Sequence, residues 1–229
     1  MPRKKSRTDL REIASYGIPE AAHYLGLSEA TLRSWVIGRK YSTTSGIKTS
    51  PPLISPADAK SETLSFYNLV EAHVLMFTRQ VYGIQMKHVR SAIAYVRSRT
   101  PAKRPLISQV FYTDGKHLFV KELEATIDAS KMGQLGIRQI LDLYLERIDW
   151  DNEGLAARLY PVWATSHEPR SVVIDPKISF GRPVVSGTGI TASVLWHRKR
   201  LGEKIDEISK DYGLDKVAVE EAISYYQAA

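Results

Sequence analysis

The stretch Ile18-Pro-Glu-Ala-Ala-His-Tyr-Leu-Gly-Leu-Ser-Glu-Ala-Thr-Leu32 has the pattern of two short helices joined by a tight turn. The same pattern returns 187 positions later as Ile205-Asp-Glu-Ile-Ser-Lys-Asp-Tyr-Gly-Leu-Asp-Lys-Val-Ala-Val219. In each copy a glycine, Gly26 or Gly213, stands where the first helix must end, because glycine readily adopts the positive φ of that position. The sequence therefore predicts a helix-turn-helix unit near each end of the chain.

The two copies differ in the charge of the second helix and its exit. Residues 28–40 carry a net charge of +2, whereas residues 215–227 carry −2. DNA presents closely spaced negative charge, so affinity for it depends on Lys and Arg at the contact surface. We therefore predict that the front unit reads DNA and that the rear unit meets a protein. The alternative is that both are structural helix pairs.

The composition favours an acidic partner. The 229 residues include 32 Lys and Arg against 25 Asp and Glu, giving a net charge of +7 and a pI near 9.5, a balance typical of nucleic-acid-binding proteins. The absence of cysteine excludes disulfides, thiolate metal sites and thiol nucleophiles. No apolar run approaches the ~18 residues of a membrane span, and residues 1–10 lack the apolar core of a signal peptide. We therefore expect a cytoplasmic protein with no membrane partner.

Local patterns predict the elements between the two units. Residues 38–56 are rich in Ser, Thr, Gly and Pro, which predicts a loop with a short hairpin, in the position of a DNA-contacting wing. A solvated linker is the alternative. Asp-Gly at residues 114 and 115, between apolar runs, predicts a β-hairpin. The apolar spacing further predicts helices over residues 64–82, 84–99 and from 137, and short strands at 159–164 and 172–174.

The rear segment is expected to contain a short extended element and three helices. The extended element covers residues 183–185, and the helices cover residues 191–201, 203–212 and 215–227. We therefore expect a mostly α-helical fold with small β elements (α+β). Its expected parts are a winged helix-turn-helix domain over residues 1–100, a central β-hairpin and helix region over 101–168, and a C-terminal three-helix domain with short strands over 169–229.

Two family resemblances add to this interpretation. The segment Gly17–Trp35, with the run Thr31-Leu-Arg33 and an aromatic residue two positions later, resembles the winged helix-turn-helix of MerR-type regulators. Residues 64–75 resemble the helix that follows the wing in that family. The resemblance covers about the first hundred residues and implies that Arg33 contacts the phosphate backbone of DNA.

The rear segment, residues 174–226, resembles a small domain of once unknown function found in prokaryotic VapB-type antitoxins. The resemblance rests on Asp175-Pro176, on Gly181 to Ile190 and on Gly202-Glu203. Gly189 departs from the pattern, because many relatives carry Arg there. The combination of both parts is similar to a subgroup of VapB antitoxins, whose partners are PIN-like ribonuclease toxins.

Candidate site residues follow from these patterns. In the front unit Leu32, Trp35 and Val36 supply the apolar face, so the residues between them face outward, where Arg, Thr and Ser can bond phosphates or base edges. The candidate DNA-binding residues are Ser28, Thr31, Arg33, Ser34, Arg39, Lys40, Tyr41 and Lys48. The candidate partner-binding residues of the rear domain are Arg182, Trp196, Arg200, Glu220 and Tyr225.

Catalysis is the function class with the least support. The acidic residues are scattered, apart from Asp149, Asp151 and Glu153, which we interpret as residues of a helix end and turn. The six His residues include no pair at the i, i+4 spacing of a metal site. We therefore expect no enzyme activity, no metal and no cofactor.

The expected function is that of the antitoxin of a type II toxin–antitoxin pair. The resemblance implies that it binds its own operator DNA and the PIN-like ribonuclease toxin encoded beside it. A homodimer is expected because operators of this kind usually carry two half-sites, with residues 84–99 and the central sheet as candidate dimer surfaces. The alternative is a stand-alone MerR-like transcription regulator that responds to a small organic effector. A concave apolar pocket formed by residues 106–165 would support this alternative.

Overall fold

The computed structural model describes residues 9–44, 46–79, 84–99, 104–108, 111, 115–125, 136–161 and 170–228. Within these residues the chain is mostly helical and carries three two-stranded antiparallel sheets, which confirms the predicted α+β class. The helices are α1 (Ile18–Tyr24), α2 (Glu29–Val36), α3 (Phe66–Leu75), α4 (Met86–Arg99), α5 (Lys116–Glu124), α6 (Ile137–Leu145), α7 (Ala192–Arg200), α8 (Ile205–Tyr212) and α9 (Lys216–Ala228). The strands are β1 (Arg39–Thr43), β2 (Gly46–Ser50), β3 (Ile148–Trp150), β4 (Ala156–Leu159), β5 (Val172–Val173) and β6 (Val184–Val185).

Both predicted helix-turn-helix units are present. Gly26 and Gly213 end α1 and α8 with φ values of 60° and 63°, the left-handed conformation expected of a helix-ending glycine. The side chain of Ser28 accepts a hydrogen bond of 3.3 Å from the backbone N–H of Thr31 and so caps α2. Asp215 accepts one of 2.7 Å from the N–H of Val217. The local turn signals in the sequence are thus sufficient to locate both units.

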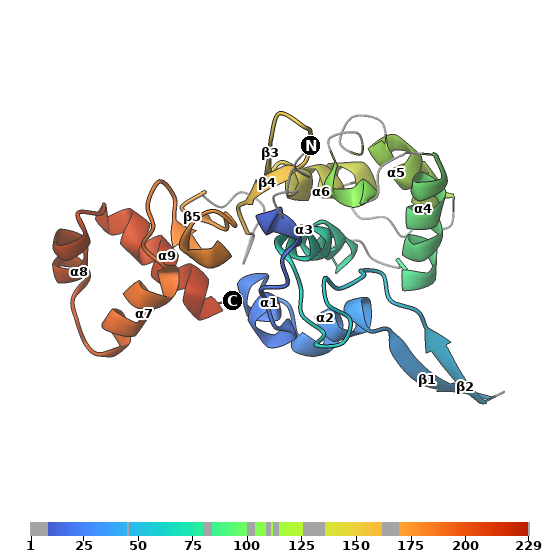
Figure 1. The fold of residues 1–229 in the computed structure, drawn as a ribbon, viewed down its shortest axis with the longest axis horizontal. Helices are drawn as coiled ribbons and strands as arrows, with labels where there is room; N and C mark the ends of the chain where they lie inside the picture. Colours follow the sequence, from blue (N-terminus) through green and yellow to red (C-terminus); the bar gives the residue numbers. More distant parts are fainter. Residues whose placement is uncertain are drawn as a thin grey trace, which may run out of the picture.

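Helix α3 is the central element of the larger part of the molecule (Figure 1). All ten of its residues are buried, as expected for a helix that is surrounded by other elements. Ser65 and Asn68 form a capping box at its start. The predicted helix over residues 64–82 therefore begins close to the expected position, and continues after α3 as a 3-10 helix, Met76–Arg79.

One hydrophobic core runs through the front and the central part of the chain. It begins at Tyr16, includes the apolar residues of α1 to α6, and ends at Ile174. Residues on both sides of position 100 thus pack against each other, with α4 lying along α5.

The hairpin predicted around Asp114 and Gly115 is wrong, because residues 116–124 form helix α5 and residues 105–107 form a 3-10 helix. Residues 112–114 lie outside the described residues. A short apolar run fits either a strand or a buried helix, and tertiary packing decides between them. Here the ring of Phe119 meets Phe77 and Phe111 edge-on, with centroid distances of 5.9 and 5.6 Å.

The central β-hairpin lies later in the chain than predicted. Strand β3 pairs antiparallel with β4, with Ile148 opposite Leu159. Asp149 belongs to β3, so its assignment to a helix end is wrong. Asp151 and Glu153 lie in the turn that follows, as predicted for the turn part of this group. Of the strand predicted over residues 159–164, only residue 159 belongs to β4, and residues 162–164 lie outside the described residues.

The rear domain has a hydrophobic core of its own. Strand β5 pairs with β6, and α7, α8 and α9 pack around Leu195, Ile208 and Ile223. These three helices form one end of the molecule (Figure 1), and their bounds agree with the prediction to within two residues at each end. Within the part of the chain that the structure describes, no helix is both long and apolar enough to span a membrane.

Candidate nucleic-acid interface and partner surface

Helix α2 presents one face to the core and the other to solvent. Leu32, Trp35 and Val36 are buried, as predicted from their spacing. Arg33 is exposed on the opposite face, and Thr31 and Ser34 are partly exposed beside it. The polar residues of α2 are therefore available to a partner.

The hairpin β1–β2 follows α2 and projects away from the body of the protein (Figure 1). Tyr41 stands opposite Lys48 in its register, and the strand residues are exposed except at their last positions. Gly38, with φ of 90°, lies at the junction between α2 and β1, where a Cβ atom would come within 2.4 Å of the carbonyl oxygen of Ser50. The missing side chain thus allows β1 to start, and β2 to end, directly beside the end of α2.

Two adjoining grooves lie between α2 and the hairpin. The first has a volume of about 610 Å³, and the second, which shares Ser34 and Arg39 with it, has a volume of about 470 Å³. Six of the eight candidate DNA-binding residues line these grooves: Thr31, Arg33, Ser34, Arg39, Lys40 and Tyr41. We call this surface the α2–wing surface.

The remaining two candidates have other positions. The hydroxyl of Ser28 is used in capping α2 and lies 2.8 Å from the hydroxyl of Thr31. Lys48 lies on β2, next to the exposed Ile47. Neither residue lines the two grooves.

Arg33 is held by two carboxylates. Its guanidinium makes ion pairs of 3.0 Å with Glu29 and 2.9 Å with Glu62. Hydrogen bonds to Glu29, and then to Glu62, raise the pKa of Arg33. All three side chains are exposed, and exposed ion pairs are weak because water screens them. A phosphate group could therefore replace these carboxylates as the partner of Arg33.

The start of α4 completes the second groove, which the sequence did not indicate. Gln85, Met86, Lys87 and Arg90 line it together with Ser50. The guanidinium Nε of Arg90 donates a hydrogen bond of 2.9 Å to the carbonyl oxygen of Pro51 and so fixes α4 against the end of the hairpin. This contact joins residues 39 positions apart, so no local sequence pattern could have revealed it.

The candidate partner-binding residues of the rear domain lie in different environments. Arg182, Arg200 and Glu220 are exposed. Trp196 is half-buried, with its ring against that of Tyr226 at 5.5 Å and the guanidinium of Arg200 over it at 4.7 Å.

Tyr225, the fifth candidate, is fully buried, so its side chain does not form part of a partner surface. Its hydroxyl donates a hydrogen bond of 2.8 Å to the carbonyl oxygen of Tyr24 on α1. Burial raises the pKa of Tyr225 well above its usual value. The front unit covers this side chain, which the pattern of the last helix alone does not indicate.

The rear domain and the front unit meet through further aromatic contacts. The ring of Tyr226 packs edge-on against His23 at 4.6 Å. The hydroxyl of Tyr16 donates a hydrogen bond of 3.0 Å to the carbonyl oxygen of Gly181. A Cβ atom on Gly181 would lie 2.0 Å from that hydroxyl, so the two domains approach closely where only a glycine fits.

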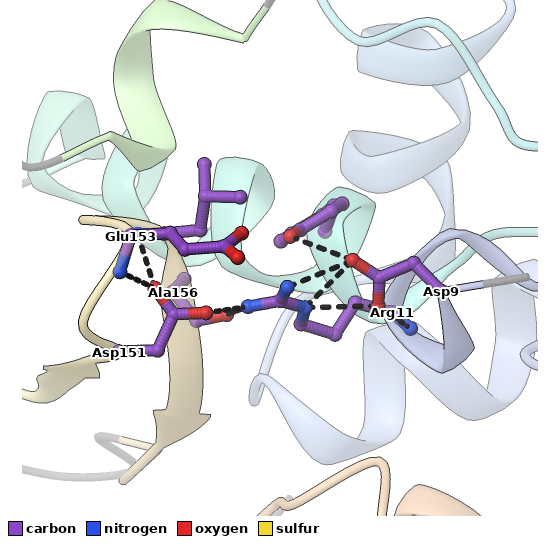
Figure 2. A network of polar contacts seen from close by, with 7 residues as sticks. Asp9, Arg11, Asp151, Glu153 and Ala156 are labelled. Carbon is purple, nitrogen blue, oxygen red and sulfur yellow. Dashed lines mark hydrogen bonds and ion pairs between the residues drawn. The ribbon is translucent and has the colours of Figure 1, made fainter. Parts of the chain in front are cut away.

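A network of charged groups ties the start of the described chain to the central hairpin. Figure 2 shows the guanidinium of Arg11 between the carboxylates of Asp9 and Asp151. The hydrogen bond from Arg11 lowers the pKa of Asp9. Asp151 also accepts hydrogen bonds of 2.9 Å from the N–H groups of Glu153 and Leu155. Among the described residues no group of His, Cys, Asp or Glu side chains is arranged to hold a metal ion.

A cavity of about 250 Å³ opens beside this network. Tyr67 lies in its wall, with the guanidinium groups of Arg11 and Arg104 5.3 and 5.8 Å from the centre of its ring. The lining residues are Asp9, Glu12, Tyr67, Arg104, Ile107, Ser108 and Leu155. Apolar and charged groups therefore line the same open pocket.

Helix α3 carries two buried ionisable groups. Burial raises the pKa of Glu71, whose carboxylate pairs with Arg104 at 2.8 Å. Burial also lowers the pKa of His73 to about 4. The Nε2–H group of His73 donates a hydrogen bond of 3.1 Å to the carbonyl oxygen of Tyr144. His73 is thus held in the neutral form.

Comparison with known proteins finds one family model and several relatives. The model of a family described as "Protein of unknown function (DUF433)" matches residues 172–226. The matched range corresponds to the rear domain with its separate core.

The relatives match nearly the whole chain. "Putative antitoxin VapB45" of Mycobacterium tuberculosis is 24% identical over 228 residues, which cover 93% of this chain and 93% of that protein. "Uncharacterized protein Rv2308" of the same organism is 22% identical over 229 residues, covering 96% and 93%. The crystal structure of Rv2018 from Mycobacterium tuberculosis has the same fold, with a TM-score of 0.66 and 21% identity over 92% of this chain and 98% of that one. The chain is therefore similar, along its length, to a protein named "Putative antitoxin VapB45".

Proposed function

We propose that this chain is the antitoxin of a type II toxin–antitoxin pair. In this role its front unit binds the operator DNA of its own operon, and its rear domain binds and neutralises a PIN-like ribonuclease toxin encoded beside it. The observation that carries the proposal is the similarity to "Putative antitoxin VapB45" over 93% of both chains.

The α2–wing surface supports the DNA-binding part of the proposal. A helix with an exposed polar face fits the major groove of DNA, which is about 12 Å wide. Arg39 and Lys40 lie where the hairpin leaves α2, and Lys48 lies farther along it. In this position they would contact phosphates on the flanks of the site, while Thr31 and Ser34 face the bases.

A homodimer forms part of the same proposal. A reader of this type usually binds two half-sites about one helical turn, or ~34 Å, apart, and the two-fold symmetry of such an operator matches that of a dimer. Two α2–wing surfaces would then act on one operator, and the contacts of each protomer would add to the affinity.

Co-expression with the product of the adjacent gene tests the proposal. The neighbour expressed alone should arrest growth, and this chain should restore growth and co-purify with the neighbour as a stable complex. A harmless neighbour that does not co-purify would contradict the antitoxin function.

A separate experiment tests the DNA-binding part. The affinity for the DNA upstream of the operon is measured at several salt concentrations for the unaltered protein, for Lys40→Ala and for the control Lys199→Ala. Lys40→Ala should lower the slope of log K against log salt by ~0.9, as expected for one lost phosphate contact, and should still neutralise the neighbour. Lys199 lies on α7 of the rear domain, so its variant should keep the full slope. Equal slopes for all three proteins would exclude Lys40 from the DNA interface.

The cavity beside Tyr67 favours a second candidate function, that of a stand-alone MerR-like regulator controlled by a small organic effector. Its volume of about 250 Å³ suits a small molecule. Its lining combines the carboxylates of Asp9 and Glu12 and the guanidinium of Arg104 with apolar groups, so a compound with both an amino and a carboxylate group fits its chemistry. A thermal-shift screen with free amino acids and their derivatives, followed by operator binding with each hit, distinguishes this function from the first.

A further inference from the structure

The turn between β5 and β6 holds an aromatic side chain in water. Phe180 is 91% exposed, and no other large apolar side chain among the described residues is more exposed. A benzyl group in this position makes little contact with its own domain and leaves most of its apolar surface in water, which is unfavourable for the free protein.

The backbone of this turn is strained as well. Ser179, Phe180 and Gly181 have consecutive φ values of 46°, 57° and 75°, the left-handed region that is unfavourable for side chains with a Cβ atom. Glycine would fit at position 180 without this strain. Phe180 thus has both a strained backbone and an exposed ring, and strained residues that persist in a fold are frequent at sites of function.

The turn is fixed from several sides. The hydroxyl of Ser179 donates a hydrogen bond of 2.8 Å to the carbonyl oxygen of Gly189. The N–H of Gly181 donates one of 2.8 Å to Ile178, and the carbonyl of Gly181 accepts the hydroxyl of Tyr16. These hydrogen bonds therefore fix the backbone at Phe180 before a partner binds, and such preorganisation lowers the entropy lost on binding.

The charges beside Phe180 indicate the chemistry of its partner. Lys177 and Arg182 flank it in the sequence, and both are exposed. Within the described part of the chain neither side chain makes an ion pair with a carboxylate. An apolar pocket with a rim of carboxylates would match an aromatic ring between two cations.

The net charge of the rear domain favours a protein over a nucleic acid. Residues 172–226 contain eight Lys and Arg and eight Asp and Glu, so their net charge is zero, and the excess of positive charge lies in the rest of the chain. A neutral domain lacks the general attraction to phosphates on which nucleic-acid binding depends. Exposed aromatic residues that fill pockets are, by contrast, typical anchors of protein interfaces.

We propose that Phe180 is the anchor of the surface with which the rear domain binds its toxin, and that the toxin supplies an apolar pocket with a carboxylate-rich rim. Lys177 and Arg182 complete this surface as the cations that face the rim. The inference rests on the proposed function, since it takes the identity of the partner from it.

The variant Phe180→Gly separates binding from folding. Glycine removes the ring and relieves the backbone strain, so the melting temperature should stay the same or rise by a few degrees. The affinity for the purified product of the adjacent gene should fall by about 30-fold, the loss that marks an interface anchor. Leu201→Ala is the matched control, because Leu201 is 83% exposed in the same domain and its variant should bind like the unaltered protein.

The outcomes decide between the proposals. If the unaltered protein does not bind the neighbour, the proposed function fails and this inference fails with it. If the unaltered protein binds but Phe180→Gly binds equally well, or Leu201→Ala loses as much, only the assignment of Phe180 is overturned. A clear fall in the melting temperature of Phe180→Gly would mean that the ring is structural, and would also overturn it.

Two further measurements test whether a second copy of the chain or a nucleic acid, and not the toxin, binds at Phe180. Sedimentation of the chain alone would detect a second copy at this surface, if Phe180→Gly dissociated a dimer and left toxin binding intact. Fluorescence anisotropy with a single-stranded oligonucleotide would detect a nucleic acid, if binding required Phe180. Either result would overturn the proposal, and unchanged sedimentation and anisotropy would support it.

Discussion

The hydroxyl of Tyr225 donates a hydrogen bond of 2.8 Å to the backbone carbonyl of Tyr24, across 201 positions of the chain. Tyr24 is the last residue of α1, and the final carbonyls of a helix need partners from outside it. The last helix of the rear domain therefore supplies a hydrogen bond to the first helix of the front unit.

Replacing Tyr225 with Phe should weaken this junction. The variant leaves the buried ring in place and removes one hydrogen bond to a buried carbonyl, which costs about 1–3 kcal/mol. Calorimetry should show a melting temperature lower by several degrees. Tyr95→Phe on α4, where the ring is half-buried and stacks under Arg99, is the control and should melt like the unaltered protein. Equal melting temperatures for all three proteins would contradict the role of the Tyr225 hydroxyl.

Adding a methyl group at Gly181 should be more harmful than adding one at Gly187. Both glycines have positive φ, 75° and 80°, so Ala is strained at either position by roughly 1–2 kcal/mol. At Gly187 the new Cβ atom meets nothing within 4 Å, whereas at Gly181 it lies 2.0 Å from the hydroxyl of Tyr16. Chemical unfolding should therefore show an extra loss of about 1–3 kcal/mol for Gly181→Ala.

The same experiment has an internal check. Tyr16→Phe removes the hydroxyl that the new methyl group meets, although the ring carbon that carried it remains 3.1 Å away. The loss in free energy of unfolding caused by Gly181→Ala should therefore be smaller in the Tyr16→Phe background than in the unaltered protein. Equal losses in the two backgrounds would indicate that the two residues do not interact.

Removing the charge of Glu62 should strengthen operator binding. Glu62 is one of the two carboxylates that pair with Arg33, at 2.9 Å, so Glu62→Gln leaves only Glu29 to compete with a phosphate for the guanidinium and removes one negative charge near the DNA. The pair is exposed and therefore weak, so the gain in affinity should be small, a few-fold at most at low salt. Glu220→Gln, an exposed change in the rear domain, serves as the control in a binding titration. An unchanged or lower affinity for Glu62→Gln would contradict the role of Arg33.

His73 should make the stability depend on pH. Its pKa is lowered from 6.5 to about 4 in the folded protein by burial, with Arg147 contributing, so the unfolded chain binds the proton more readily. The stabilisation is fully present above pH 6.5 and is lost as the pH falls towards 4. With 1.36 kcal/mol for each unit of pKa, the loss amounts to about 3 kcal/mol.

Urea unfolding between pH 4 and 7 checks this dependence. The curve of His73→Gln should be flatter than that of the unaltered protein, whatever its absolute stability. The comparison between the two proteins isolates His73 from Glu71, whose raised pKa contributes with the opposite sign. Parallel curves would mean that the imidazole does not titrate in this range.

The elements that could be predicted from the sequence are those with local signals. Gly26 and Gly213 end helices because of their own conformational freedom, and Ser28 caps α2 through an atom of its own side chain. The α+β class and the position of the hairpin β1–β2 followed from patterns of the same kind.

The features that could not be predicted depend on distant contacts. Residues 116–124 fold as a helix because Phe119 packs against Phe77 and Phe111. The short apolar run alone does not indicate these contacts. Tyr225 was expected on the surface, and only the position of α1 explains its burial. The approach of Arg90 to the hairpin is a contact of the same kind. Local sequence patterns thus predict many helices and turns, whereas the side chains that are exposed or buried depend on the whole fold.

The separate core of the rear domain has a consequence for the history of such chains. Residues 172–226 bury their apolar residues largely among themselves, and the matched family model covers these residues alone. A unit with this property can be joined by recombination to a different front half without repacking either interior. Only the few contacts at the junction, such as those of Tyr16 and Tyr24, then need to adapt to the new neighbour.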